Sequence, residues 1–230
     1  MQWKEGRRLQ FRHEIKHRIN YCDMLVLRQR LSAVMEADSH SENGRYMIRS
    51  LYFDTLSDRA LREKHDGVNE REKFRMRYYN GDTSFICLEK KSKLGGLCSK
   101  QSVRITEEQA RLITGCDIES LAGAGGLLTE LYSKMTSEGL KPKTIVDYTR
   151  EPYVFAPGNV RVTLDHDIRT GLSYTDFLDP LAVTVPVPEE GIILEVKWDE
   201  FLPDIIRDAV TLPDRNASAF SKYAVCRSYG

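Results

Sequence analysis

The stretch KFRMRY, residues 73–78, decides how this chain is expected to fold. Basic side chains alternate in it with large apolar ones. Because successive residues of a β-strand point to opposite faces, the alternation predicts a strand with one charged face and one apolar face. The same period of two runs from Arg12 to Ile19, where Arg12, Glu14 and Lys16 share a face.

Further strands are expected where β-branched and aromatic residues gather between turn residues. The turns are Asn-Gly-Asp at 80–82, Leu-Gly-Gly at 94–96 and Pro-Gly-Asn at 157–159, which are typical of connections between antiparallel strands. The segment 181–188, rich in Val and Pro, is expected to be a connection. The remaining predicted strands are 46–54, 84–91, 99–105, 144–150, 160–165 and 191–198.

Fewer helices are expected than strands. An apolar stripe over 24–35 predicts a helix capped by Asp23, and Thr106 with Gln109 forms the pattern of a capping box before a short helix through Ile113. Two more helices are expected at 127–135 and 217–227. The predicted class is therefore α+β with a large antiparallel sheet.

Composition limits the class of protein. The chain has 230 residues, with 34 Lys plus Arg against 34 Asp plus Glu, and 41% are hydrophobic, so we expect one globular domain over 1–230. A net charge of zero argues against coating nucleic acid, and no apolar run is long enough to span a bilayer. The polar start lacks a secretory signal, which predicts a cytoplasmic protein whose association with a membrane would need a separate membrane-protein partner.

Two arrangements would explain the charged faces. The common explanation of such alternation is an open antiparallel sheet with one solvent-exposed face and one face packed on the core. Alternatively, the strands form a closed barrel in which the apolar faces point outward under helices and Arg, Lys and Glu line a water-filled bore. Such a bore would concentrate anions, because Arg guanidinium groups match phosphate oxygens two at a time.

The carboxylates on these faces suggest a metal. Glu14, Glu89 and Glu195 would repel phosphate unless a divalent cation lay between them. Mg²⁺ or Mn²⁺ fits that role, because both take oxygen ligands and bridge carboxylates to substrate phosphates. For any one of the three, pairing with a neighbouring Lys or Arg is the simpler explanation.

Eight short motifs, taken in chain order, together resemble a known family. They are FRHEIK at 11–16, RSLYFDT at 49–55, RMRYY at 75–79, LEKK at 88–91, YTR at 148–150, RVTLD at 161–165, LEVK at 194–197 and FSKY at 220–223. The chain resembles the VTC domain, the catalytic domain of polyphosphate polymerases, over about residues 8 to 228. That domain is one of the triphosphate tunnel metalloenzymes, of the CYTH-like superfamily.

The resemblance implies a fold, a chemistry and a set of site residues. The fold is a closed eight-stranded antiparallel β-barrel, the triphosphate tunnel, with flanking helices, and the cofactor is Mn²⁺ or Mg²⁺. The implied activity is transfer of the γ-phosphoryl group of ATP to polyphosphate. Glu195 would ligate the metal, with Glu14 and Glu89 as further candidates. Lys16, Lys100 and Arg12 are candidate substrate-binding residues. The implied catalytic residues are Arg75, Arg77, Lys91, Arg150, Arg161, Lys197 and Lys222.

One departure and three alternatives accompany this resemblance. The superfamily's Glu-x-Glu-x-Lys signature has Arg12 in place of the first Glu, which weakens the case for a second metal site used in hydrolysis. The alternatives are an inorganic triphosphatase or polyphosphate hydrolase, a non-catalytic polyphosphate-binding module, and a nucleic-acid surface built on the basic strand with Tyr78 and Tyr79. The neutral net charge and the interleaved glutamates disfavour the last. We assign no role to Tyr52, Tyr78 or Tyr79, which we expect in the core.

Overall fold

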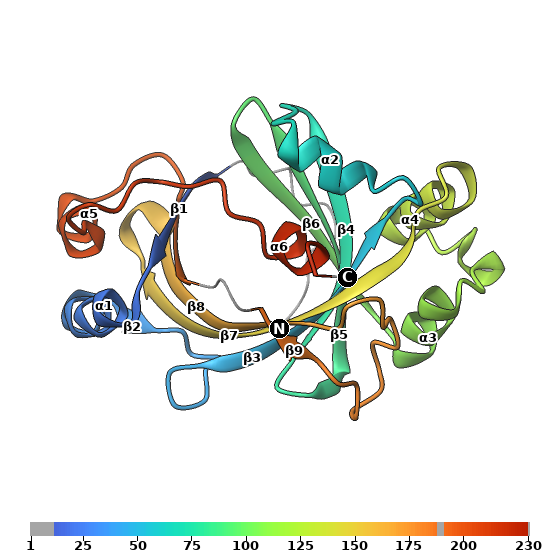
Figure 1. The fold of residues 1–230 in the computed structure, drawn as a ribbon, viewed down its shortest axis with the longest axis horizontal. Helices are drawn as coiled ribbons and strands as arrows, with labels where there is room; N and C mark the ends of the chain where they lie inside the picture. Colours follow the sequence, from blue (N-terminus) through green and yellow to red (C-terminus); the bar gives the residue numbers. More distant parts are fainter. Residues whose placement is uncertain (1–11, 188–190, 230) are drawn as a thin grey trace.

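One antiparallel sheet dominates the computed structural model, which describes residues 12–187 and 191–229 (Figure 1). Short strands β2 (Glu36–Ala37) and β9 (Val185–Pro186) pair with β7 and β8. The main sheet has the order β1 (His13–Ile19), β10 (Ile192–Trp198), β8 (Val160–Thr170), β7 (Lys141–Phe155), β3 (Tyr46–Asp54), β4 (Arg71–Tyr79), β5 (Asp82–Leu94) and β6 (Leu97–Ile105).

The predicted turns join antiparallel neighbours as expected. Asn80 and Gly81, with φ of 51° and 75°, connect β4 to β5, and two positive φ values in succession match the twist of a tight hairpin. Gly158 turns β7 into β8, within the 3-10 turn η2 (Pro157–Asn159), at φ +70°. A Cβ atom there would lie 2.5 Å from the Phe201 carbonyl oxygen, so this position needs glycine.

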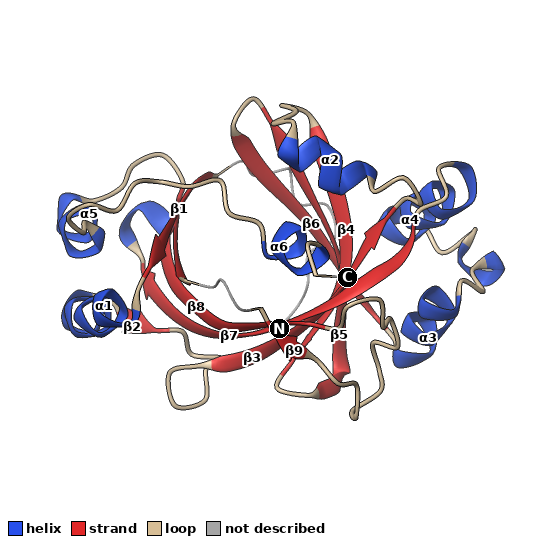
Figure 2. Ribbon diagram, viewed as in Figure 1, coloured by secondary structure: helices blue, strands red, loops and turns tan. Residues whose placement is uncertain are grey.

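Helices cover the outside of the curved sheet at both ends (Figure 2). At one end α1 (Tyr21–Val34) packs against α5 (Asp204–Val210), and at the other lie α3 (Glu107–Gly115), the 3-10 turn η1 (Glu119–Leu121) and α4 (Gly126–Ser137). Helix α2 (Arg59–His65) lies beside β4, and α6 (Lys222–Arg227) packs in the hollow of the sheet.

Some helix predictions need correction. Thr106 and Gln109 form the predicted capping box of α3. Asp23, in contrast, is the third residue of α1, and Asn20 is its cap, with the two side chains satisfying each other's backbone N–H groups. The predicted helix over 217–227 begins only at Lys222, because Ser221 caps it and residues 217–218 lie along β1. Seven-residue helices α2 and α5 were not predicted, since a run that short barely shows the helical period.

The apolar faces of the strands point toward these helices. Leu51, Met76 and Leu88 are fully buried with α3 and α4, and Val162 and Val196 are fully buried with α1 and α5. Their neighbours in sequence therefore face the hollow. This confirms the expectation that apolar faces lie outward under helices while charged faces turn inward.

The expectation of a closed barrel is corrected. In the described residues, edge strands β1 and β6 meet at a single bridge, in which Arg12 and Cys98 exchange backbone hydrogen bonds of 3.1 and 3.4 Å. Further along, the free edge of β1 is taken by the segment 217–218, where Ser218 N–H donates to the Lys16 carbonyl at 2.7 Å. Because that segment occupies the edge, β6 cannot pair there, and the sheet is a half-barrel with a seam.

Across the described ranges, no helix is long and apolar enough to cross a membrane. The prediction of one domain over 1–230 stays a prediction.

Candidate functional site

Charged side chains from strands far apart in sequence meet on the concave face. The register places Glu14 opposite Lys197 and Lys16 opposite Glu195 between β1 and β10. Residues opposite each other in an antiparallel pair project from the same face, so all four turn inward together. The alternation noted in the sequence thus becomes a two-by-two arrangement of acids and bases.

The first cluster joins β1, β10 and β5. Lys16 Nζ lies 2.9 Å from a Glu14 carboxylate oxygen and 3.3 Å from one of Glu195. Lys197 pairs with Glu195, and Lys91 reaches across the seam to Glu14 at 2.7 Å. The ion pairs fix both carboxylates and all three ammonium groups in one place.

The lysines keep these carboxylates charged. Burial and the neighbouring Glu195 would raise the pKa of Glu14, but Lys16, Lys91 and Lys197 outweigh both and hold it well below its usual range. Burial likewise opposes ionisation of Glu195, whose pKa Lys197 and Lys16 keep well below normal. Both side chains therefore offer anionic oxygens at any physiological pH.

The second cluster centres on Asp165 of β8, which is fully buried. Arg150 of β7 binds its two oxygens through Nε and Nη2 at 2.6 and 2.7 Å, and Lys222 of α6 donates to it at 2.5 Å. Both cations also lie over the Tyr148 ring, 5.4 and 4.6 Å from its centroid. A helix and two strands thereby hold two positive charges side by side.

The third cluster lies on β4 and β5. Arg75 pairs with Glu89 at 2.6 Å, and Lys100 of β6 binds the same carboxylate at 3.0 Å. Arg77, only 3% exposed, donates to the Ser50 hydroxyl at 3.0 Å and to the Tyr148 hydroxyl at 2.8 Å. Within the described ranges Arg77 forms no direct ion pair, although Glu89 acts on it through space, so its guanidinium could also contact a bound anion.

Two predicted residues lie apart from these clusters. Arg161 pairs with Asp38 at 2.6 Å and donates to the Tyr46 hydroxyl at 2.7 Å. Arg12 pairs with Asp199 at 2.7 Å, just beyond the end of β10, and it also donates to the Asn159 carbonyl. The structure thus brings eleven of the thirteen predicted residues into the three clusters and sets these two at the periphery.

Sequence reasoning missed several members of the site. Asp165 and Lys73 lie on charged faces that the alternation does predict, but no role in the site was assigned to either from the sequence. Tyr52 is buried in the core as expected, in the cluster that includes Tyr223 of α6, and its hydroxyl accepts a hydrogen bond from Arg75 at 2.9 Å. Burial would raise its pKa, but Arg75, Lys73 and Arg77 lower the pKa of Tyr52 to about 7. Tyr78 is likewise buried as expected, under the outer helices.

The carboxylates present fit a divalent cation held jointly with substrate. The described residues contain no group of three His, Cys, Asp or Glu side chains that could enclose an ion. However, Glu14 and Glu195 both contact Lys16, and opposite Glu195 lies Thr163, whose buried hydroxyl has no hydrogen-bond partner among the described residues. Two carboxylates and a hydroxyl suit Mg²⁺ or Mn²⁺ that completes its shell with phosphate oxygens and water. Glu89, enclosed by Arg75 and Lys100, fits this role less well.

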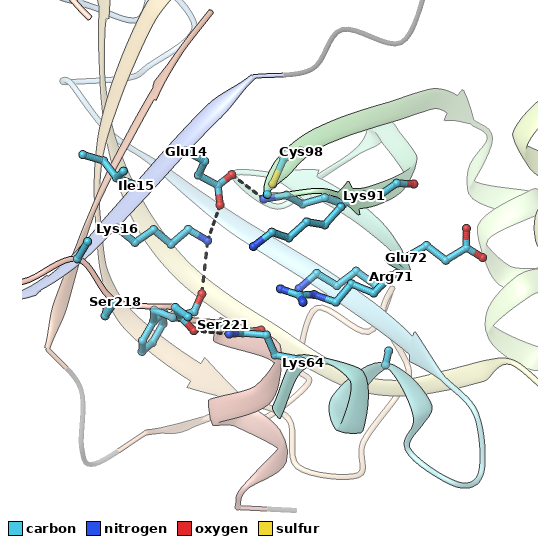
Figure 3. A pocket seen from close by; sticks show the side chains of 18 residues that line it. Glu14, Ile15, Lys16, Lys64, Arg71, Glu72, Lys91, Cys98, Ser218 and Ser221 are labelled. Carbon is cyan, nitrogen blue, oxygen red and sulfur yellow. Dashed lines mark hydrogen bonds and ion pairs between the residues drawn. The ribbon is translucent and has the colours of Figure 1, made fainter. Parts of the chain in front are cut away.

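A cavity of about 320 Å³ opens beside the first cluster, at the seam (Figure 3). Its walls come from β1, α2, β4, β5, β6 and the segment 217–221. In Figure 3 the side chains of Lys16, Lys64, Arg71 and Lys91 extend into this space from different elements. The site is therefore open to solvent on the side where the sheet fails to close.

Comparisons with known proteins agree with this architecture. The sequence matches the family described as the VTC domain over residues 11–229. The fold is similar to that of the PH1012 protein from Pyrococcus horikoshii OT3, at 13% identity and a TM-score of 0.51, covering 93% of this chain and 98% of that one. It is also similar to bh2851 from Bacillus halodurans, a candidate adenylate cyclase, at 14% identity and a TM-score of 0.50, covering 82% and 81%. No curated protein shows significant sequence similarity to the chain.

Proposed function

The chain belongs to the VTC domain family, and from that premise we propose that it is a metal-dependent polyphosphate polymerase that uses ATP as phosphoryl donor. The observation that carries the proposal is the convergence of Lys16, Arg77 and Lys222, from β1, β4 and α6, on one concave surface. Many cations on many elements suit a flexible polyanion, whereas a compact anion needs only one or two.

The proposed reaction needs no covalent protein nucleophile. A terminal oxygen of the acceptor polyphosphate attacks the γ-phosphorus of ATP and forms a new P–O bond. The bond from the γ-phosphorus to the β–γ bridging oxygen breaks, and its electron pair leaves with ADP. The acceptor oxygen is already ionised near neutral pH, so the protein's task is alignment and neutralisation of charge.

Each cluster has a part in that task. Arg75 and Arg77, spaced on one face of β4, bind oxygens of the transferring and leaving phosphates, and Arg150 with Lys222 binds the opposite side. The buried carboxylates Glu89 and Asp165 hold these cations in place before substrate arrives. Mg²⁺ or Mn²⁺, held by Glu195 with Glu14 beside it, supplies further charge neutralisation at the phosphate oxygens when bound.

The proposal predicts that Glu195→Gln and Arg77→Ala each lower polymer formation by about a hundredfold or more. Glu195→Gln keeps the shape of the side chain but removes the anionic oxygen, and Arg77→Ala removes a buried cation that forms no direct ion pair among the described residues. The measurement incubates each protein with ATP and MnCl₂ and resolves polyphosphate and ADP from free phosphate. Circular dichroism verifies that the variants fold.

A matched control is Arg111→Gln, which removes one cation from the exposed surface of α3 and should keep full activity. Full activity in Glu195→Gln would remove the metal assignment. If the wild type releases only free phosphate, the protein is a hydrolase and the polymerase proposal is wrong. Tight polyphosphate binding without turnover under any metal would indicate a binding module.

A further inference from the structure

The cavity at the seam contains four cations that the proposed reaction does not use. We call Lys64, Arg71, Lys73 and Lys93 the mouth cluster; they come from α2, β4 and β5. With Lys16 and Lys91 they bring six cations to the cavity walls, against the two carboxylates Glu14 and Glu72. This excess of positive charge is local, because the chain as a whole is neutral.

Neither carboxylate balances the mouth cluster. Glu14 is engaged by Lys16 and Lys91. Glu72 points away from the cavity in Figure 3 and pairs with Lys90 and Lys134 at 2.9 and 2.7 Å.

The cluster's own contacts leave its charges uncompensated. Lys64 donates to the Ala219 carbonyl and Arg71 to the Val68 carbonyl, neither of which carries a charge. In the part of the chain that the structure describes, no carboxylate pairs with Lys73 or Lys93. The cavity therefore holds several ammonium and guanidinium groups that no described carboxylate pairs with directly.

The β4–β5 ladder forces these charges together. Arg71 lies opposite Lys93, and Lys73 lies opposite Lys91, so two successive cross-strand pairs on one face carry like charges. Like charges directly opposite each other destabilise a sheet. Burial, with Lys91, Lys16 and Arg75, lowers the pKa of Lys73 to about 8 although Tyr52 opposes the shift. An anion between the strands would relieve both costs.

The position of the cluster indicates the shape of that anion. Arg77, Arg75, Lys73 and Arg71 occupy every second position of β4, a row of about 20 Å at the rise of an antiparallel strand. The row runs continuously from the central clusters to the open cavity, and it is longer than one triphosphate group. A linear polyanion extending out of the central site would follow it.

We propose that the mouth cluster binds the phosphates of a linear polyphosphate chain that lie beyond the central site, and so selects long chains over triphosphate. The inference rests on the proposed polyphosphate substrate. It assigns the seam cavity to the acceptor chain and leaves ATP to the central clusters.

The test compares affinities for a long-chain polyphosphate, tripolyphosphate and ATP, measured by titration calorimetry without turnover. The variants are Lys73→Gln and the double variant Lys64→Gln/Lys93→Gln. We expect each to weaken long-chain binding about tenfold or more, as for loss of charge-assisted hydrogen bonds, and to change the other two affinities less than about twofold. The control Arg111→Gln should bind all three ligands as the wild type does.

Two outcomes would overturn the inference. Unchanged long-chain affinity would show that the cavity does not hold the chain. Equal losses for long-chain polyphosphate and tripolyphosphate would place the mouth cluster in the central site. If length-selective loss is found but the wild type makes no polymer from ATP, the polymerase proposal fails while the binding assignment stands.

Discussion

At the scale of single residues, Asp165 illustrates how the site is held charged. Burial alone would raise its pKa, but the guanidinium of Arg150 and the ammonium of Lys222 outweigh burial and lower the pKa of Asp165 to about 2. A carboxyl group with a depressed pKa stabilises the fold above its unfolded pKa of about 3.9 and loses that contribution as pH falls through the folded value.

We therefore expect Asp165→Asn to lower the free energy of unfolding by about 3–5 kcal/mol at neutral pH, because it leaves two buried cations uncompensated. Between about pH 4 and pH 2 the free energy of unfolding of the wild type should fall as Asp165 becomes protonated. The variant lacks this carboxylate, so this part of the pH dependence should be missing from it. Urea denaturation at a series of pH values measures both effects. Asp204→Asn, at an exposed aspartate of α5, is the control and should change stability by less than about 0.5 kcal/mol. Equal pH dependence in wild type and Asp165→Asn would contradict this account.

Lys73 gives a second prediction at this scale. Its pKa of about 8 reflects burial and the facing cations Lys91, Lys16 and Arg75, with Tyr52 opposing. A bound polyanion favours the charged form and raises that pKa, so binding just above pH 8 should take up protons. Calorimetric enthalpies measured in two buffers of different ionisation enthalpy give the uptake. We expect Lys73→Gln to reduce it, and an unchanged uptake would place the titrating group elsewhere.

At the scale of elements, a buried hydrogen bond links helix α6 to β3 and α2. The Tyr223 hydroxyl donates to Asp54 at 2.5 Å, and Asp54 also accepts from the backbone N–H groups of Ala60 and Leu61 at 2.8 and 3.1 Å. One carboxylate thus ties the end of β3, the first turn of α2 and the helix that carries Lys222. Burial and this hydrogen bond raise the pKa of the Tyr223 hydroxyl, so it remains a donor.

Tyr223→Phe should therefore lower the free energy of unfolding by about 1–3 kcal/mol, the cost of leaving a buried acceptor partly unsatisfied. Because α6 carries Lys222, we also expect a raised KM for polyphosphate. Urea denaturation and steady-state kinetics measure the two effects. Phe220→Leu in the preceding segment is a comparison that keeps this hydrogen bond. A stability loss with unchanged KM would show that α6 does not position Lys222.

The sequence could predict strands better than helices for a physical reason. A strand such as β4 shows several repeats of its two-residue period within six residues, so the stretch KFRMRY was sufficient to predict that strand. Helix α6 has six residues and α2 has seven, which is too short to show a helical period in the sequence, and both are tied to Asp54 by hydrogen bonds. The cap of α1 was misplaced because Asn20 and Asp23 are both good capping residues, and backbone geometry alone decides between them.

At the scale of the whole molecule, pairing between strands could be predicted only in part. Turn residues linked β4 to β5 and β7 to β8, but nothing in the local sequence shows that Glu14 of β1 meets Lys91 of β5 across the seam. The prediction that these side chains converge came from the resemblance to the VTC domain. That resemblance also led to a closed barrel, which is wrong because the segment 217–218 takes the edge that β6 would need.

The seam predicts uneven local stability. Among residues 12–187 and 191–229, the backbone amides of β6 that face β1 have one partner bridge, at Cys98, whereas β7 and β8 are paired on both sides. We expect hydrogen exchange to be fastest for the seam-facing amides of β6 and slowest in β7 and β8, since edges open with less free energy than central strands. Mass spectrometry of the exchanged protein measures this. Equal protection in β6 and β7 would mean that the seam is closed in solution.

The Arg12–Cys98 bridge gives the molecule the form of a clasp rather than a ring. A ring releases a threaded polymer only from its ends, and the time needed grows with polymer length. A clasp fastened by that bridge and by the Lys91–Glu14 ion pair would let a polymer escape sideways whenever these contacts break. If the proposed polymerase activity holds, the number of additions per encounter would be set by how often the clasp opens, and product length would depend on these seam contacts rather than on the chemical step.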